Sequence, residues 1–81
     1  MTAMSEADWA EHVTLDPDVQ SGAPVIRGTR VPVSVLVDAV ASGDDVPVVA
    51  RSYRLTEAQV RAALAYAAEL VRSERAVALP R

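Results

Sequence analysis

Cysteine, lysine and phenylalanine are absent from this chain of 81 residues, and histidine occurs once, at His12. Without cysteine the chain forms no disulfide and offers no thiolate to a metal, and one imidazole is too few for an ordinary zinc site. The three aromatic residues are Trp9, Tyr53 and Tyr66, so the core must be built from Val, Leu, Ile and Ala. We therefore expect no metal and no cofactor.

Long apolar runs are missing as well. None approaches the roughly 20 residues that cross a bilayer, and no basic segment precedes an apolar stretch as in a secretory signal. The length allows one small domain with a core that makes it only marginally stable. We expect a soluble, cytoplasmic protein that does not enter a membrane.

The charge is unevenly distributed. Residues 1–18 hold five acidic residues and no Arg, whereas residues 19–81 hold eight Arg and six acidic residues, and the chain carries a net charge of −3. The weakly basic body does not suit a protein that binds any polyanion, because such binding needs many phosphate contacts. It suits a dimer that places a few Arg at chosen phosphates.

The chain begins with an acidic segment, residues 1–10, that lacks a capped periodic pattern and is expected to be a flexible arm. Short β-branched segments at residues 12–15 and 25–26 predict two strands, which must pack on helices because an isolated pair is not stable. Residues 11–72 are then a single domain, and the tail, residues 73–81, is expected to fray.

Three helices are expected after the ribbon. Pro32 suits a helix start, and the helix over residues 33–42 ends at Gly43, which favours a left-handed cap. Asp44 or Asp45 can cap a short second helix that carries Pro47 in its first turn. Thr56 is the expected N-cap of the third helix, Glu57 to about Arg72. The predicted fold class is α+β and mainly helical.

Two stripes run along the third helix. The first falls at i, i+3, i+4, i+7 and i+11 and is expected to face the core: Val60, Ala63, Leu64, Ala67 and Val71. The second is expected to form the interface of a homodimer, unless the ribbon covers it within one chain: Ala58, Ala62, Ala65 and Tyr66.

The second and third helices resemble a helix-turn-helix unit. Ala50 is a small residue at the expected contact, Leu55 seals the corner, and Val60 is the first buried position of the following helix. An ordinary three-helix bundle can use the same corner for packing alone. If the unit binds DNA, its expected contacts are Arg51, Arg54, Thr56, Gln59 and Arg61. Of these, Gln59 and Arg61 are the expected readers of base edges.

The segment G-A-P-V-I-R-G-T-R-V-P-V, residues 22–33, is rich in turn residues and carries two Arg. Arg27, Thr29 and Arg30 are candidates for secondary contacts with phosphate or with a partner protein. The alternatives are a rigid turn with solvated Arg side chains, or ion pairs with the acidic arm.

No catalytic constellation is recognisable. Asp16 and Asp18 flank Pro17 and are explained by turn formation, and His12 has no nucleophile arranged around it. We therefore expect that the protein is not an enzyme.

From about His12 to Leu70 the chain closely resembles the bacterial family named domain of unknown function 433. The stretch G-x-P-V-I-x-G-T-R-V-P-V is its most distinctive part, and L-T-E-x-x-V-R-A-A-L-x-Y-A-A supports it. The resemblance implies a small winged or homeodomain-like helix-turn-helix fold. It further implies an antitoxin similar to VapB-type antitoxins, which binds its own promoter and neutralises a PIN-like ribonuclease toxin. The alternative is a protein–protein interaction or dimerisation module without DNA binding.

Overall fold

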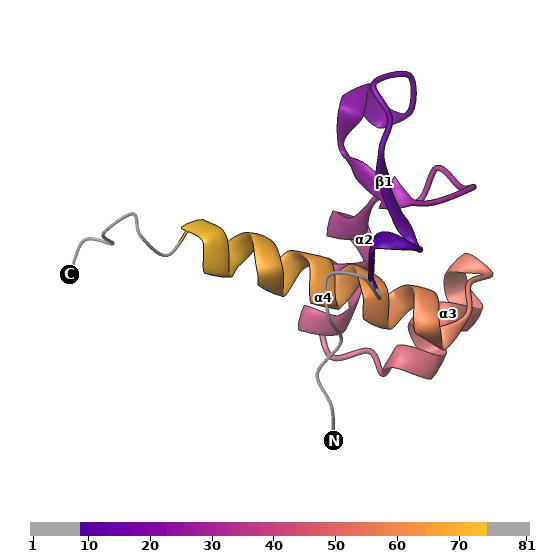
Figure 1. Ribbon diagram of the computed structural model, residues 1–81. Helices are drawn as coiled ribbons and strands as arrows, with labels where there is room; N and C mark the ends of the chain where they lie inside the picture. The colour runs from indigo at the N-terminus through magenta and orange to yellow at the C-terminus, as the bar shows by residue number, and fades with distance from the viewer. Residues whose placement is uncertain (1–8, 75–81) are drawn as a thin grey trace.

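The computed structural model describes residues 9–74. Their elements, shown in Figure 1, are β1 (Val13–Leu15), the short 3-10 helix η1 (Gln20–Gly22), β2 (Pro24–Ile26), α2 (Val33–Ala41), α3 (Val46–Tyr53) and α4 (Glu57–Glu74). The predicted fold class, α+β and mainly helical, is confirmed. None of the helices within the described residues is both long and apolar enough to span a bilayer.

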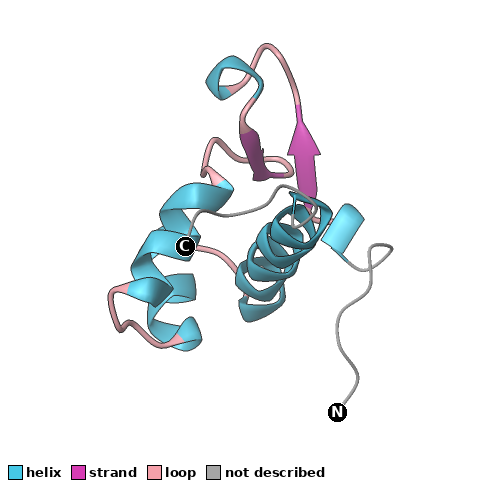
Figure 2. Cartoon of the chain, turned by 90° about the vertical axis from the view of Figure 1, so that its left-hand side faces the viewer, coloured by secondary structure: helices cyan, strands magenta, loops and turns pink. Residues whose placement is uncertain are grey.

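The ribbon is antiparallel and stands above the helices (Figure 2). Val13 pairs with Ile26, and the Arg27 amide extends the ladder by donating to the His12 carbonyl oxygen at 2.7 Å. On its other edge β2 is bridged by the chain that leads into α2, where the Ile26 amide donates to the Val31 carbonyl oxygen at 2.9 Å. The distinctive segment of the sequence is therefore the centre of the ribbon.

The loop between the strands is shaped by turn chemistry. The Oδ1 atom of Asp16 accepts a hydrogen bond from the Asp18 amide at 2.9 Å, as expected for a turn-forming pair. Gln20, Ser21 and Gly22 follow with φ angles of +49°, +57° and +85°. Left-handed backbone at two residues with a Cβ is strained, at a cost of about 1–2 kcal/mol for each residue.

The ends of α2 form as predicted. The helix starts directly after Pro32 and ends at Ala41, and its C-terminus is closed at Gly43, whose φ is +109°. The Gly43 amide donates to the Val40 carbonyl oxygen at 3.0 Å, and the Asp44 amide donates to that of Ala39 at 3.2 Å. This Schellman pattern satisfies the last carbonyls of the helix and turns the chain toward α3.

Helix α3 starts at the predicted position, but the predicted capping hydrogen bond is not formed. Asp45 occupies the N-cap position, and Pro47 lies in the first turn, where its missing amide hydrogen is not needed. The Asp45 side chain makes no capping hydrogen bond, however. The proline therefore marks this helix start more clearly than the acidic pair does.

Helix α4 packs against α2, α3 and β1 and supplies one wall of the core. Val60 and Ala63 are fully buried, and Leu64 and Ala67 are half-buried, as their stripe predicted. Val71 is 69% exposed, so its predicted place in the core was wrong. The reason is geometric, because the last turns of α4 extend beyond the other elements (Figure 1).

Most of the predicted arm, residues 1–10, and most of the predicted tail, residues 73–81, lie outside the described part of the chain. Trp9 is described and packs edge-on against the ring of Tyr66, with centroids 4.8 Å apart and planes at 77°. It also touches the core cluster. The packed domain therefore begins before residue 11, and α4 runs past its predicted end to Glu74.

Candidate nucleic-acid interface

The corner between α3 and α4 is formed by residues 54–56. Arg54 has left-handed backbone, with φ +57° and ψ +44°. Its amide donates to the Arg51 carbonyl oxygen at 3.3 Å, and the Leu55 amide donates to that of Ala50 at 2.8 Å. The same hydrogen-bond pattern closes α2, but there the left-handed residue is Gly43. An Arg in this conformation costs about 1 kcal/mol, because its Cβ is crowded. Leu55 is half-buried against the core, as expected for a corner seal.

The start of α4 is a capping box. The Thr56 Oγ1 atom accepts from the Gln59 amide at 3.1 Å, and the Gln59 Oε1 atom accepts from the Thr56 amide at 2.8 Å. The predicted N-cap is confirmed. The Gln59 Oε1 atom is thus engaged within the chain, and a bidentate contact with adenine would require the same atom.

Arg61 is paired within its own helix. Its guanidinium lies 3.1 Å from the Glu57 carboxylate, and both side chains are about half exposed, at 56% and 46%. An exposed i,i+4 pair stabilises a helix by only about 0.3–0.5 kcal/mol. Arg61 can therefore exchange Glu57 for another acceptor at small cost.

Arg51 and Arg54 complete the cationic side of the corner. Both are exposed, and neither guanidinium has a hydrogen bond or an ion pair within residues 9–74. The capping box occupies the amides of Thr56 and Gln59, which leaves those of Glu57 and Ala58 at the helix end for an outside acceptor. The corner thus offers two unengaged cations and a helix N-terminus to an anion.

Arg27 has a structural role that sequence reasoning missed. Its Nε atom donates to the Glu11 carbonyl oxygen at 3.2 Å, and its Nη2 atom donates to those of Ala10 and Val13 at 3.1 and 3.3 Å. In this structure the Arg27 guanidinium holds the chain that enters β1, and its proposed contact with phosphate stays a prediction.

Thr29 is also engaged. Its hydroxyl donates to the Ile26 carbonyl oxygen at 2.7 Å and accepts from the Val31 amide at 3.0 Å, around a turn in which Gly28 has a φ of +81°. Arg30 is exposed, and its guanidinium has no hydrogen bond or ion pair in the described part of the chain. Of the three secondary candidates, Arg30 alone keeps its side chain available there.

The predicted dimer stripe needs a further correction. Ala62 is fully buried within its own chain, so it cannot meet a second copy of the folded protein. Tyr66 is half-buried against Trp9. Ala58 is exposed and Ala65 is half-buried, which leaves no continuous alanine surface. For Ala62 the alternative applies, because this side chain is covered within its own chain.

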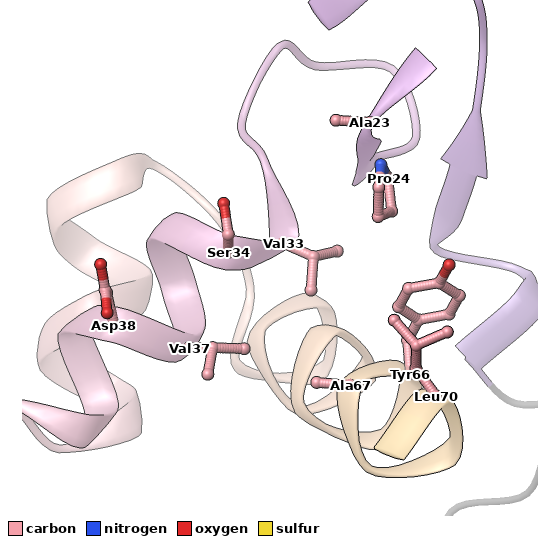
Figure 3. Close-up of a pocket in the computed structure, with 9 residues that line it drawn as sticks. All are labelled: Ala23, Pro24, Val33, Ser34, Val37, Asp38, Tyr66, Ala67 and Leu70. Atoms are coloured by element: carbon pink, nitrogen blue, oxygen red, sulfur yellow. The ribbon is translucent and has the colours of Figure 1, made fainter. Parts of the chain in front are cut away.

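An apolar groove of about 420 Å³ lies between α2 and α4, below the start of β2 (Figure 3). Val37 and Ala67 face each other across its floor, while Asp38 lies on the α2 rim and Leu70 on the α4 rim. No local sequence pattern indicated it, because the groove arises from the separation of two helices. Within residues 9–74, no group of three potential metal-ligating side chains was found.

The "uncharacterized protein y4eO" of Sinorhizobium fredii (strain NBRC 101917 / NGR234) is 41% identical over 58 residues, which cover 70% of this chain and 26% of that protein. The chain thus spans about a quarter of the length of that relative. None of the solved structures matches the chain. The sequence profile of the family described as "Protein of unknown function (DUF433)" matches residues 13–67, more than half of the chain, and the protein therefore belongs to that family.

Proposed function

We propose that this protein is the DNA-binding antitoxin of a toxin–antitoxin pair, which binds its own promoter and neutralises a PIN-like ribonuclease toxin. The observation that carries the DNA-binding part is the corner between α3 and α4, where Arg51 and Arg54 are exposed and unengaged beside the start of α4. The antitoxin part is supported by the family resemblance, which implies a role similar to that of VapB-type antitoxins.

The residues of the corner take different roles in this proposal. Arg51 and Arg54 hold backbone phosphates, and the Glu57 and Ala58 amides add a contact at the positive end of α4. Arg61 reads a base edge after leaving Glu57, and guanine is its best partner. Thr56 and Gln59 set the start and direction of the helix instead of reading bases.

Arg54→Gly is the sharpest variant for the DNA contact. Glycine relieves the left-handed strain, so the protein should become more stable by about 1 kcal/mol. The same change removes one phosphate contact, so promoter affinity should fall and the salt slope, d log K/d log[salt], should flatten by about one. Fluorescence anisotropy at several salt concentrations measures the second effect, and thermal unfolding measures the first.

Arg30→Ala is the matched control for Arg54→Gly, because it removes the same charge from the ribbon. It should leave the salt slope of promoter binding unchanged. If only Arg30→Ala flattens the slope, the DNA surface lies on the ribbon and the assignment to the corner is wrong. If neither variant flattens it, Arg54 makes no contact with phosphate.

The toxin is tested separately. Co-expression with the product of the neighbouring reading frame should give a complex that co-purifies, and the pair should restore growth that the toxin alone arrests. The corner variants Arg51→Ala and Arg54→Gly provide the control, because loss of promoter binding should leave toxin neutralisation intact if two surfaces are used. A neighbouring product that neither binds nor is toxic would contradict the antitoxin role.

A second candidate is a protein interaction module that keeps the corner without binding DNA. It is favoured by the engagement of both expected base readers, Gln59 in the capping box and Arg61 with Glu57. In that case the protein would show no salt-dependent affinity for promoter DNA and would still bind its partner protein.

A further inference from the structure

The last turns of α4 carry apolar side chains that residues 9–74 cover only in part. Leu70 is 45% exposed and Val71 is 69% exposed, at the end of the helix that extends beyond the domain (Figure 1). A helix in a globular protein derives most of its stability from packing an apolar face. Within residues 9–74 these turns therefore have too little apolar surface to pack on.

The groove between α2 and α4 lies beside this projecting end. Its walls are apolar over Pro24, Val33 and Val37 on one side and Tyr66, Ala67 and Leu70 on the other (Figure 3). Leu70 belongs both to the groove wall and to the projecting end, so the two features form one continuous patch. This patch contains both a projecting helix end and a groove. Two copies of it can therefore pack against each other about a two-fold axis, with the helix end of each copy in the groove of the other.

We propose that a second copy of this chain occupies the groove, so that the last turns of α4 of each protomer lie against α2 and α4 of the other. The contact is isologous, and every interaction in it occurs twice. It would cover Leu70 and Val71 and give a core of this small size a second apolar surface to bury.

Two charged residues favour one relative orientation of the two protomers. Asp38 stands on the α2 rim of the groove, and Arg72 follows Val71 on the projecting end. Arg72 lies 3.4 Å from Glu69 in its own helix, and its side chain is 60% exposed, so this pair is weak and exchangeable. Antiparallel packing of the two α4 ends brings Arg72 of each protomer to the partner's Asp38, with both pairs formed by the same symmetry.

The dimer leaves the corner between α3 and α4 free. The two ends of the 18-residue α4 lie about 25 Å apart at 1.5 Å per residue. Association through the C-terminal turns therefore places both N-terminal corners outside the interface. The inference does not depend on DNA binding, and either can fail without the other.

Sedimentation equilibrium of the full chain tests the interface. Wild-type protein should have twice the mass of one chain at micromolar concentration, and Val71→Glu should raise the dimer dissociation constant by about a hundredfold, because it brings two carboxylates into a desolvated patch. Val48→Glu is the matched control, the same change at an exposed position on α3, and should leave dimerisation unchanged. Circular dichroism verifies that both variants fold.

A charge exchange tests the orientation. Asp38→Arg and Arg72→Glu should each weaken the dimer by about tenfold, and the double variant should recover to near wild type, because the pair is restored in reverse. A wild-type protein that is monomeric at high micromolar concentration, or a dimer that survives Val71→Glu, would overturn the proposal. Single variants whose losses add in the double variant would overturn the pairing of Asp38 with Arg72.

Discussion

Ala62→Glu is expected to unfold the protein. Ala62 is fully buried in α4, and the described residues contain no buried polar or charged side chain that could pair with a carboxylate there. An uncompensated buried charge costs about 3–5 kcal/mol. A core of this size rarely supplies more than about 3–5 kcal/mol of net stability, so the substitution should remove nearly all of it.

Ala58→Glu is the matched control for Ala62→Glu. It introduces the same side chain one turn earlier in the same helix, at an exposed position near the positive end of the helix dipole. We expect Ala58→Glu to fold normally, as measured by far-ultraviolet circular dichroism and urea titration. If Ala62→Glu had an unchanged unfolding midpoint, this face of α4 would be open, and it would again be a candidate for self-association.

The second large effect is expected for Arg27→Ala, which should lower the free energy of unfolding by about 2 kcal/mol. One guanidinium donates to three backbone carbonyl oxygens, those of Ala10, Glu11 and Val13. A hydrogen bond to a charged group contributes about 1.5–3 kcal/mol, and the exposure of two of these bonds reduces their sum. Removing the side chain therefore frees the segment that connects Trp9 to β1.

Two further variants show whether the lost stability comes from the charge of Arg27 or from its hydrogen bonds to the carbonyl groups. Arg27→Lys keeps the charge but cannot reproduce the fork of donors, so we expect it to recover less than half of the lost stability. Arg30→Ala removes the same charge from a side chain with no partner in the described chain and should cost less than about 0.5 kcal/mol. Urea unfolding followed by the fluorescence of Trp9 measures all three. Equal midpoints for Arg27→Ala and Arg30→Ala would show that the carbonyl contacts contribute nothing.

The elements that depend on local chemistry could be predicted from the sequence. Pro32, Gly43 and Thr56 each favour one backbone conformation or one capping bond, and each begins or ends a helix where expected. The ribbon followed for the same reason, because turn residues separate short β-branched segments. In such places the neighbours in the sequence decide the structure.

The faces of α4 could be predicted only in part. Periodicity identifies stripes, but it does not say which of two adjacent stripes another part of the chain covers. Ala62 is buried in a helix that contacts β1, an element far away in the sequence. Val71 continues the core stripe yet is exposed, because the helix is longer than the body it packs on.

The candidate site shows the same division between local and distant causes. The sequence T-E-A-Q at residues 56–59 is a recognisable capping box, so the engagement of Gln59 had a signal that was not used. Arg27 had none, because its acceptors are carbonyl groups 14 to 17 residues earlier in the chain. Backbone acceptors leave no trace in the amino-acid sequence.

The contact between β1 and α4 also determines when this protein can fold during its synthesis. β1 is made first and α4 last, and the core residues Val13 and Val60 lie on these two elements. A nascent chain that ends before α4 has neither the wall against which the ribbon packs nor the partner that covers α2 and α3. Helices form within about a microsecond, whereas a core that joins β1 to α4 must wait until α4 has been made. Folding of this domain is therefore expected to occur in one step, once α4 has left the ribosome.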